Sequence, residues 1–524
     1  MDDQSPSFNR RRFLVKGATG LASASATTIA LKTLALKPDR VAFAQHRANL
    51  PEIQFAISNF IAPAHTFNDG GGDVVLQFGP VFTCFQTMQL TRLPGMTDFQ
   101  TWHDALESIE AAYPFSPSGV FTFVSYGLPY FNRLPKRLVQ AYMPSLRKDP
   151  SRFALEESIS YPTDYPQQKK KTFNVPVVIE KNDVLLTLRS DSLENIHDIL
   201  KWLQGSNSLR GKALRSPHFK GLFTFTSSRI MFQQIGLPRK VAHQFHLPYA
   251  SRVNPKSPMW MGFADQQTSA SGPAEIVTFQ GNSSARFASL PDDYFKNGAI
   301  QHLSHVIQDM SQFYGKDEPY TERVQYMFRS DPIPSLGNPK DQFANGGGPC
   351  FFANDASIFL QYREQGVTEA SQTGRDIGKL GDGVNKVNDP QPATSPNAGD
   401  VGKVRPRMGH LPALQQSSRA PDGTPIHIRM DGPGFDDMDV PDGSIQAKLQ
   451  FTIFVPTADF FTTMRINQAA LKYQQRENAN GKSTSLGVEA DANGIERFLS
   501  ATRRQNFLVP PRSHRVFPLR ELLD

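Results

Sequence analysis

One histidine, His427, lies between two isoleucines in the segment Thr-Pro-Ile-His-Ile-Arg-Met-Asp-Gly-Pro-Gly, which begins at Thr424 and ends in a turn sequence. A long polar stretch precedes this segment. A short apolar frame of this kind could present an imidazole to a buried cofactor, because a neutral imidazole nitrogen is a common ligand of transition metal ions. A hydrogen-bonded histidine in the core would have the same surroundings, so the residues alone leave both interpretations open.

A single carboxylate, Asp265, follows the apolar run Met-Trp-Met-Gly-Phe-Ala that begins at Met259. Burial at the end of such a run would raise the pKa of this carboxyl group and let it accept and release a proton near neutral pH. Asp265 would then act as a proton shuttle. The alternative is that Asp265 caps the turn that follows it.

Two further pairs of histidines could bind a metal ion. His243 and His246 are three residues apart, a spacing that faces one ion on a helix, but a proline soon ends any helix and no carboxylate stands at a useful distance. His302 and His305 fall in an expected strand. Alternation along a strand sends them to opposite faces, so we expect each to be a hydrogen-bonded residue of a sheet.

Several standard signatures of catalytic chemistry are absent. The chain has no HExxH, CxxCH, GxSxG, Walker or dinucleotide-binding motif. Its two cysteines, Cys84 and Cys350, are too few for a cysteine-ligated iron–sulfur cluster or a four-cysteine zinc site, although they could form one disulfide. The acidic run Asp436-Asp437-Met-Asp439-Val-Pro-Asp442 lacks the spacing and the closing glutamate of a calcium loop, which favours a polar loop.

The elements that must position these residues follow an α+β pattern. Alternation and helical periodicity predict, in order, strand 74–85, helix 98–112, strand 119–125, strands 175–179 and 184–189, and helix 192–204. This order is typical of a ferredoxin-like sandwich, with helices on one face of an antiparallel sheet, although its last strand is not apparent.

The second half repeats the theme. The patterns predict strands at 275–279, 299–307 and 449–456, and helices at 308–314, 322–329, 457–473 and 493–502. We therefore expect two ferredoxin-like domains, at 50–204 and 259–524, joined by a connection at 205–258. The stretch 363–425 is poor in large apolar residues and too long for an ordinary connection, which indicates an inserted functional loop or a partly disordered segment.

The charge of the chain is concentrated at its beginning. Of the formal net charge of +7, residues 1–44 carry +4, which leaves +3 for the other 480 residues and no basic stripe for nucleic acid. The first 44 residues contain Arg10-Arg11-Arg12-Phe-Leu, a weakly apolar stretch and Ala42-Phe43-Ala44. This resembles a twin-arginine signal peptide with a small-x-small cleavage site, and no run of about 20 apolar residues predicts a membrane span. We therefore expect export by the twin-arginine machinery to the periplasm or beyond the cell.

Two α+β halves behind such a leader resemble the dye-decolorising peroxidase superfamily. In the first half the resemblance lies in Gly119-Val-Phe-Thr-Phe-Val-Ser-Tyr-Gly-Leu-Pro-Tyr-Phe131 and in Asn182-Asp-Val-Leu-Leu-Thr-Leu188. In the second half it lies in Met261-Gly-Phe-Ala-Asp-Gln266, in Glu322 to Asp331, in His427-Ile-Arg429, in Lys448 to Val455 and in Asn506-Phe-Leu-Val-Pro-Pro511. Members of the superfamily carry a b-type haem in a dimeric ferredoxin-like fold.

The resemblance implies a haem peroxidase that oxidises a small-molecule substrate with hydrogen peroxide. His427 would be the axial ligand of the haem iron, with Arg429 and Phe263 beside the haem and Asp265 as the distal acid/base. A carboxylate that accepts the other N–H of the ligand would strengthen it as an electron donor, and Asp436, Asp437 and Asp439 are the candidates. A homo-oligomer is also conceivable on this resemblance.

Two departures from the superfamily pattern concern the distal side of the haem. The interval from Met430 to Ala447, where a distal arginine is expected, contains none, and the sequence does not fix the direction of Lys448. Gln266 stands in place of a glycine. These departures leave a second interpretation, a haem-free descendant that binds a small molecule or a partner protein, and a third, a non-haem metal enzyme that uses His302, His305 or the acidic run.

Overall fold

A computed structural model describes most of the chain in the stretches given next, together with a few single residues and the pairs 34–35 and 326–327. The stretches are 50–61, 65–68, 73–76, 79–160, 172–173, 175–219, 221–255, 257–262, 274–281, 287–315, 427–461 and 495–523. The polar stretch 363–425 except His410, the arginines of the leader, and most of the expected helices 322–329 and 457–473 lie outside these residues.

The first half has the connectivity of a ferredoxin-like sandwich. Its elements are β3 (Phe82–Leu90), α2 (Met96–Ala112), β4 (Phe121–Gly127), β8 (Val184–Ser190), α5 (Leu193–Leu203) and β11 (Phe223–Phe232). The strands are antiparallel and lie in the order β11-β3-β8-β4. This is the β-α-β-β-α-β arrangement, and its last strand lies within residues 205–258, which the sequence suggested as a connection.

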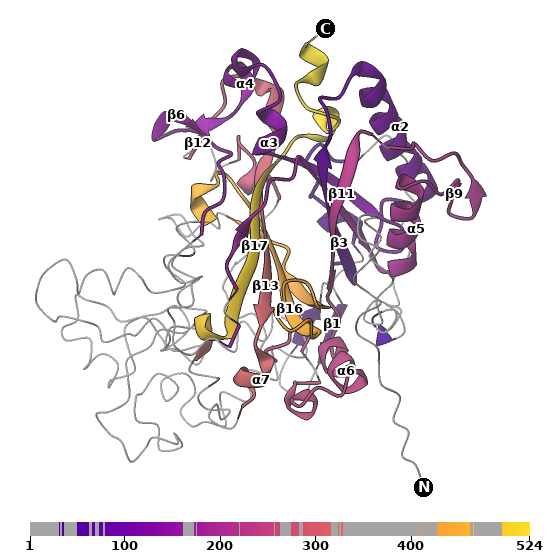
Figure 1. Ribbon diagram of the computed structural model, residues 1–524, viewed down its shortest axis with the longest axis vertical. Helices are drawn as coiled ribbons and strands as arrows, with labels where there is room; N and C mark the ends of the chain where they lie inside the picture. The colour runs from indigo at the N-terminus through magenta and orange to yellow at the C-terminus, as the bar shows by residue number, and fades with distance from the viewer. Residues whose placement is uncertain are drawn as a thin grey trace, which may run out of the picture.

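Helices α2 and α5 lie beside these strands on the same side (Figure 1). Helix α5 begins after Ser192, whose hydroxyl accepts a hydrogen bond from the backbone N–H of Asn195 at 3.3 Å. Its apolar residues recur at helical spacing and are buried, as are Trp102, Leu106 and Ile109 of α2. Local capping and periodicity therefore account for both helices.

The second half repeats the strand order. Its strands are β13 (Ala299–Gln308), β14 (Ile428–Arg429), β15 (Gly432–Asp436), β16 (Gln446–Val455) and β17 (Leu499–Val509). Within the described residues they lie in the order β17-β13-β16, with β14 and β15 both paired to the far edge of β16. The α+β fold class with antiparallel sheets expected from the sequence is thus confirmed.

The two halves form one sheet. Strands β4 and β17 join them through only two residue pairs, Gly127 with Phe507 and Tyr126 with Leu508. At the other end the sheet curls until β15 lies against β11. A Cβ placed on Gly434 would come within 3.2 Å of the carbonyl oxygen of Ile230, a tighter contact than most Cβ atoms make, so the glycine favours this close approach.

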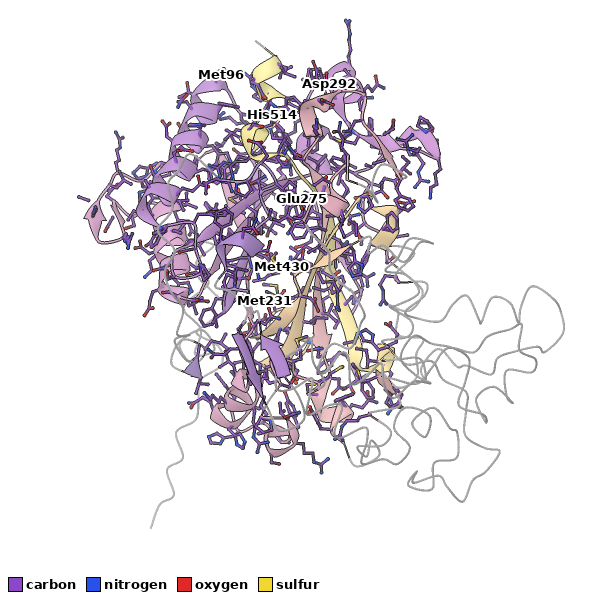
Figure 2. All side chains as sticks on the ribbon, turned by 180° about the vertical axis from the view of Figure 1, so that it is seen from behind. Met96, Met231, Glu275, Asp292, Met430 and His514 are labelled. Carbon is purple, nitrogen blue, oxygen red and sulfur yellow. The ribbon has the colours of Figure 1, made fainter. Side chains whose placement is uncertain are left out.

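The curled sheet encloses a second apolar core, separate from the core under the helices. It contains Phe85, Phe123, Leu185, Phe454 and Phe507 from both halves. Figure 2 shows two further members, Met231 and Met430, close together in the middle of the molecule. Phe55, from the segment that precedes the first half, stacks on Phe454 with ring centroids 4.2 Å apart.

Two expected elements of the second half were wrong. Residues 275–279 form no strand but lie largely in a 3-10 helix, Ala274–Val277. Residues 499–502, expected at the end of a helix, are the start of β17, which is preceded by a 3-10 turn at Glu496–Phe498. Ser500 and Ala501 pair with β13, and this long-range pairing overrides the helix-like spacing of Ile495 and Leu499.

The remaining elements are short. They are β1 (His65–Asn68), β2 (Asp73–Leu76), α3 (Leu128–Phe131), α4 (Lys136–Tyr142), β5 (Ser145–Leu146), β6 (Asp149–Phe153), β7 (Val178–Ile179), β9 (Ser208–Leu209), β10 (Lys212–Ala213), α6 (Leu237–Gln244), β12 (Ala288–Ser289) and α7 (Met310–Phe313). Among the residues that the structure describes, no helix has both the length and the apolar character to cross a membrane.

Candidate functional site

His427 lies just before β14, at the edge of the second half of the sheet. Its side chain is almost fully enclosed, with 1% of the residue exposed. Ile428 and Met430 pack in the core inside the curled sheet. Because side chains alternate along extended backbone, His427 and Arg429 are directed to the other face of the sheet.

A haem ligand fits the position of His427 in one respect. A buried imidazole on a defined strand edge is a chemically suitable axial ligand for haem iron. Arg429, which the resemblance places beside the haem, is half-buried on the same face. Asp265 and Phe263 lie outside the described residues, so their distances from His427 are not defined.

The carboxylates suggested as partners of His427 have other roles in this structure. Asp436 lies 3.3 Å from Nε2 of His305, and Asp439 makes two hydrogen bonds of 2.7 Å with Arg503. Asp437 is exposed. The carboxylate expected to accept a hydrogen bond from the ligand imidazole is therefore none of these three.

Lys448 is directed away from His427. It alternates with Ala447 and Leu449 on β16 and has the same orientation as Phe454, into the interior of the curled sheet. Its Nζ donates a hydrogen bond to the carbonyl oxygen of Met438 at 2.6 Å and lies 3.3 Å from Oδ1 of Asp436. Lys448 thus cannot serve as a distal cation on the face of the sheet to which His427 is directed.

The interior holds a chain of charged groups instead. Lys448 contacts Asp436, which contacts Nε2 of His305, and Nδ1 of His305 lies 2.8 Å from Oγ1 of Thr502 and 3.7 Å from Asp439. The Lys448 and His305 side chains are fully buried. Each carboxylate of this chain lies beside the ammonium group of Lys448 or the imidazole of His305, so the buried carboxylates have polar partners.

The chain continues into the first half. Arg503 pairs with Asp439 and lies 3.4 Å from Oε1 of Glu180. Glu180 in turn accepts a hydrogen bond from the fully buried Arg229 of β11. Sequence reasoning did not connect Arg229, Glu180 and Arg503, because they lie far apart in the chain and only the curling of the sheet brings them together.

Burial and pairing shift the pKa values in this chain. Burial lowers the pKa of His305 below its ordinary value, against the opposing effect of Asp436. Burial also lowers the pKa of Lys448. For Asp436, burial acts to raise the pKa, but His305 and Lys448 together hold it below the ordinary value.

The other histidines considered as metal ligands are His302, His305, His243 and His246. Nδ1 of His302 lies 2.7 Å from Oδ1 of Asn506, and its ring stacks on Phe461. His302 and His305 alternate to opposite faces, as expected for a strand. His243 is exposed near the end of α6, and His246 lies beyond that helix. Within the described parts of the chain, no group of three or more His, Cys, Asp or Glu residues is arranged to hold a metal ion.

Comparison with known proteins gives a family model and a set of solved structures. A model described as "Family of unknown function (DUF7405)" matches residues 82–335. No match was found among curated proteins.

The similar solved structures are DyP-type peroxidases. The enzyme from Cellulomonas bogoriensis is 11% identical, with 87% of this chain and 95% of that chain covered and a TM-score of 0.45. DtpA from Streptomyces lividans is 14% identical, with 83% and 90% covered and a TM-score of 0.44. The encapsulated DyP-type peroxidase from Mycobacterium smegmatis is 12% identical, with 84% and 95% covered and a TM-score of 0.42. At these identities the similarity concerns the path of the chain and assigns no role to a residue.

Proposed function

We propose that this protein is an exported haem-dependent oxidoreductase in which His427 is the axial ligand of the haem iron. The burial of the His427 imidazole at the edge of the second half of the sheet carries the proposal. The imidazole is directed away from the packed apolar core inside the curled sheet. A cofactor bound to it would not occupy that core.

A bound haem would supply an iron centre that hydrogen peroxide can oxidise. In this proposal His427 holds the iron as a neutral imidazole, and Arg429, the next residue directed to the same face, offers a positive charge to a haem propionate. Asp265 would be the residue that accepts and releases a proton when peroxide is bound.

Peroxide turnover by this site should be slow. A fixed cation stabilises the negative charge that develops on the departing oxygen, and removal of one such donor typically costs about 10²–10³ in kcat. Lys448, which directly follows the interval where a distal arginine is expected, is held by Met438 and Asp436 on the other face of the sheet. We therefore expect haem binding to be easier to detect than peroxidase activity.

The absorbance spectrum of protein expressed with a haem precursor tests the proposal. We expect a Soret band in the purified protein and its loss or a marked shift in His427→Ala. His243→Ala is the matched control, because His243 is an exposed histidine of α6 and its removal should leave the band unchanged. A protein without a Soret band, or with one that His427→Ala does not alter, would rule out this assignment.

A second candidate function is that of a haem-free protein that binds a small molecule or a partner protein. It is favoured by the ion pairs that Asp436, Asp439 and Lys448 make in the interior, which leave none of these three side chains available to a cofactor on the face of the sheet to which His427 is directed. Protein that stays colourless after haem reconstitution, yet is stabilised by a small-molecule ligand, would support this candidate over the first.

The proposed export rests on the leader at residues 1–44. Replacement of Arg10, Arg11 and Arg12 by lysines should leave the unprocessed chain in the cytoplasm, whereas the unmodified chain should appear outside it without residues 1–44. Immunoblots of fractionated cells measure both. Export that persists in the triple-lysine variant would contradict the twin-arginine route.

A further inference from the structure

The last part of the chain crosses from the second half of the sheet to the first. Strand β17 ends at Val509, and after Pro510 and Pro511 the residues 512–523 lie beside α2 and α3 (Figure 1). We call residues 512–523 the C-terminal clasp. The side chains that bind its backbone come from β4, from α3 and from the 3-10 helix Asp293–Phe295. None of the functions above uses this segment.

Three tyrosine hydroxyl groups bind the backbone of the clasp. Each donates to a carbonyl oxygen or accepts from an N–H group, in these pairs: Tyr126 with the carbonyl oxygen of Arg515 and the N–H of Phe517, both at 2.8 Å, Tyr130 with the carbonyl oxygen of Pro518 at 2.9 Å, and Tyr294 with the N–H of Leu519 at 2.7 Å. Peptide-binding grooves gain affinity from main-chain hydrogen bonds of this kind.

The Phe517 side chain enters an apolar pocket. Its ring centroid lies 6.2 Å from those of Tyr126 and Tyr130 and 6.0 Å from that of Phe223. Phe517 and Leu519 are both fully buried. Pockets for a few side chains give a peptide groove its specificity. The surface beneath the clasp therefore has both features of a peptide-binding groove.

An ion cluster holds the first residues of the clasp. Glu110 of α2 accepts from Nη1 of Arg512 at 2.6 Å and from Nη1 and Nη2 of Arg515 at 2.5 and 2.9 Å. Burial acts to raise the pKa of Glu110, but the two guanidinium groups hold it below its ordinary value. Because two cations share this carboxylate, removal of Arg515 weakens the clasp without leaving a buried charge unpaired.

The backbone of the clasp is strained where it is buried. Phe517 and Leu519 have φ angles of 41° and 69°. Such left-handed backbone is unfavourable for residues other than glycine and persists only where the surroundings enforce it. The groove therefore sets this conformation, and release from the groove lets both residues return to ordinary backbone angles. The strain favours opening of the clasp.

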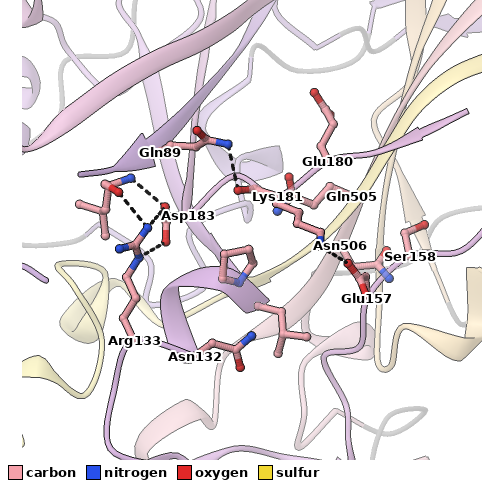
Figure 3. A pocket seen from close by; sticks show the side chains of 13 residues that line it. Gln89, Asn132, Arg133, Glu157, Ser158, Glu180, Lys181, Asp183, Gln505 and Asn506 are labelled. Atoms are coloured by element: carbon pink, nitrogen blue, oxygen red, sulfur yellow. Dashed lines mark hydrogen bonds and ion pairs between the residues drawn. The ribbon is translucent and has the colours of Figure 1, made fainter. Parts of the chain in front are cut away.

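Contacts that do not involve the clasp support the groove. Tyr126 belongs to β4, which pairs with β8 along its length. Tyr130 belongs to α3, and Arg133 just after that helix donates to Asp183 from Nε at 2.7 Å and from Nη2 at 3.1 Å (Figure 3). Asp183 is buried directly before β8, and both residues line a cavity of about 540 Å³. The two tyrosines thus keep their supports when residues 512–523 leave.

We propose that the C-terminal clasp opens as a unit while the sheet stays folded, and that the vacated groove binds the clasp of a second copy of this chain. The occupant is a second copy because the pocket for Phe517 and the carboxylate of Glu110 fit this segment. Exchange of an identical element between molecules makes no new kind of contact. Pro510 and Pro511 favour an extended connection, which carries a released clasp away from its own groove.

Hydrogen exchange of the parent chain tests the first step. The N–H groups of Phe517 and Leu519 should have protection factors similar to each other, because one opening exposes both, and about tenfold or more below those of β8. No substitution is needed, so this result does not depend on how a variant folds. Protection equal to that of β8 would show that the clasp opens only when the sheet unfolds, which would overturn the proposal.

Fluorescence anisotropy of a labelled peptide of residues 511–523 tests the second step. In the parent chain the covalently attached clasp competes with the peptide, so the apparent affinity falls with the fraction of open molecules. Arg515→Ala in the protein weakens only the attached clasp and should bind the unaltered peptide about tenfold more tightly than the parent does. A peptide that carries Phe517→Ala should bind at least about tenfold more weakly than the unaltered one.

Further variants separate the groove from the clasp. Arg520→Ala, which removes a bond from the clasp to the carbonyl oxygen of Pro94, is a second and milder clasp variant and should also raise peptide affinity. Tyr126→Phe, added to either clasp variant, should lower it again. Arg152→Ala removes an exposed arginine paired with Glu156 and should bind as the parent does. Folded clasp variants that bind the peptide no better than the parent, or equal binding of the Phe517→Ala peptide, would refute the exchange.

Discussion

His305 lies between two ion pairs of the interior, Lys448 with Asp436 and Asp439 with Arg503. Its Nε2 contacts Asp436, which is paired with Lys448, and its Nδ1 contacts Thr502 and lies near Asp439, which is paired with Arg503. Both ring nitrogens thus face acceptors, and burial nevertheless lowers the pKa. The balance between desolvation and two carboxylates decides the protonation state of this histidine, and the desolvation is the larger effect.

This balance predicts the pH dependence of stability. The pKa of His305 in the folded protein lies below the ordinary value of 6.5, so below pH 6.5 the unfolded chain binds the proton more readily. The free energy of unfolding should therefore fall as the pH drops from about 7.5 to about 5.5, by at most roughly 1.4 kcal/mol per pH unit from this residue. Asp436 and Asp439, whose pKa values are lowered from 3.8, stay ionised over this range and do not contribute.

Urea unfolding of the parent chain and of His305→Gln at both pH values measures the effect. The variant should lose the part of the pH dependence that His305 supplies, even though it is less stable at either pH. His243→Gln is the control, since His243 is exposed and its removal should leave the slope as it was. If the free energy of unfolding changed with pH equally in the parent and in His305→Gln, His305 would not be the source of the pH dependence.

At the scale of elements, the seam between β4 and β17 depends on a side chain from outside the sheet. The two strands pair only at Tyr126 and Gly127. Farther along β4, the buried amide of Gln54 bridges the gap: it accepts from the N–H of Val124 at 2.9 Å and donates to the carbonyl oxygens of Val124 at 3.0 Å and Pro510 at 2.8 Å. Gln54 thus takes the place of a strand neighbour.

Removal of this bridge should destabilise the seam locally. Gln54→Leu keeps the bulk of the side chain but leaves a buried N–H and two carbonyl groups without partners, at a cost of about 1–3 kcal/mol per unsatisfied group. We expect the amide of Val124 to exchange with deuterium faster, while amides of β8 on the other side of β4 keep their protection. Gln100→Leu, at an exposed position of α2, is the control. Unchanged exchange at Val124 would mean that β4 and β17 pair with each other there once the Gln54 amide is removed.

At the scale of the molecule, the continuous sheet and the shared interior core tie the halves into one folding unit. Phe123 and Leu185 of the first half pack in the same cluster as Phe454 and Phe507 of the second. Neither half could bury its share of this surface alone. The domain boundary expected between residues 204 and 259 stays a prediction. Apolar residues from both sides of it pack together in the core inside the curled sheet.

Cooperative unfolding follows from this shared core. Trp102 lies in α2 of the first half, whereas Nε1 of Trp260 donates to the carbonyl oxygen of Gly434 in the second. Two variants, each retaining one of these tryptophans with the others replaced by phenylalanine, should show fluorescence midpoints in urea that coincide with far-ultraviolet circular dichroism of the same variant. A fluorescence midpoint that differs from the dichroism midpoint within one variant would indicate that the halves unfold independently.

The sequence by itself determined the elements whose signals are local. Helices α2 and α5 and strands β4, β8, β13 and β16 appear close to where periodicity and alternation placed them, and the opposite directions of His302 and His305 follow from strand geometry alone. The α+β class follows from their order. These features depend on residues a few positions apart, which a linear pattern records.

Only the tertiary structure decided which charges meet. Residues 499–502 became a strand because β13 was available to pair with them, and β11 emerged from an apparent connection because it completes the first half. Asp436 and Asp439, which the sequence offered as partners of a haem ligand, contact His305 and Arg503 instead, and Lys448, whose direction the sequence left open, contacts Asp436. Their positions depend on how the sheet curls over hundreds of residues of chain, because burial leaves a charge stable only where an opposite charge from another strand can reach it.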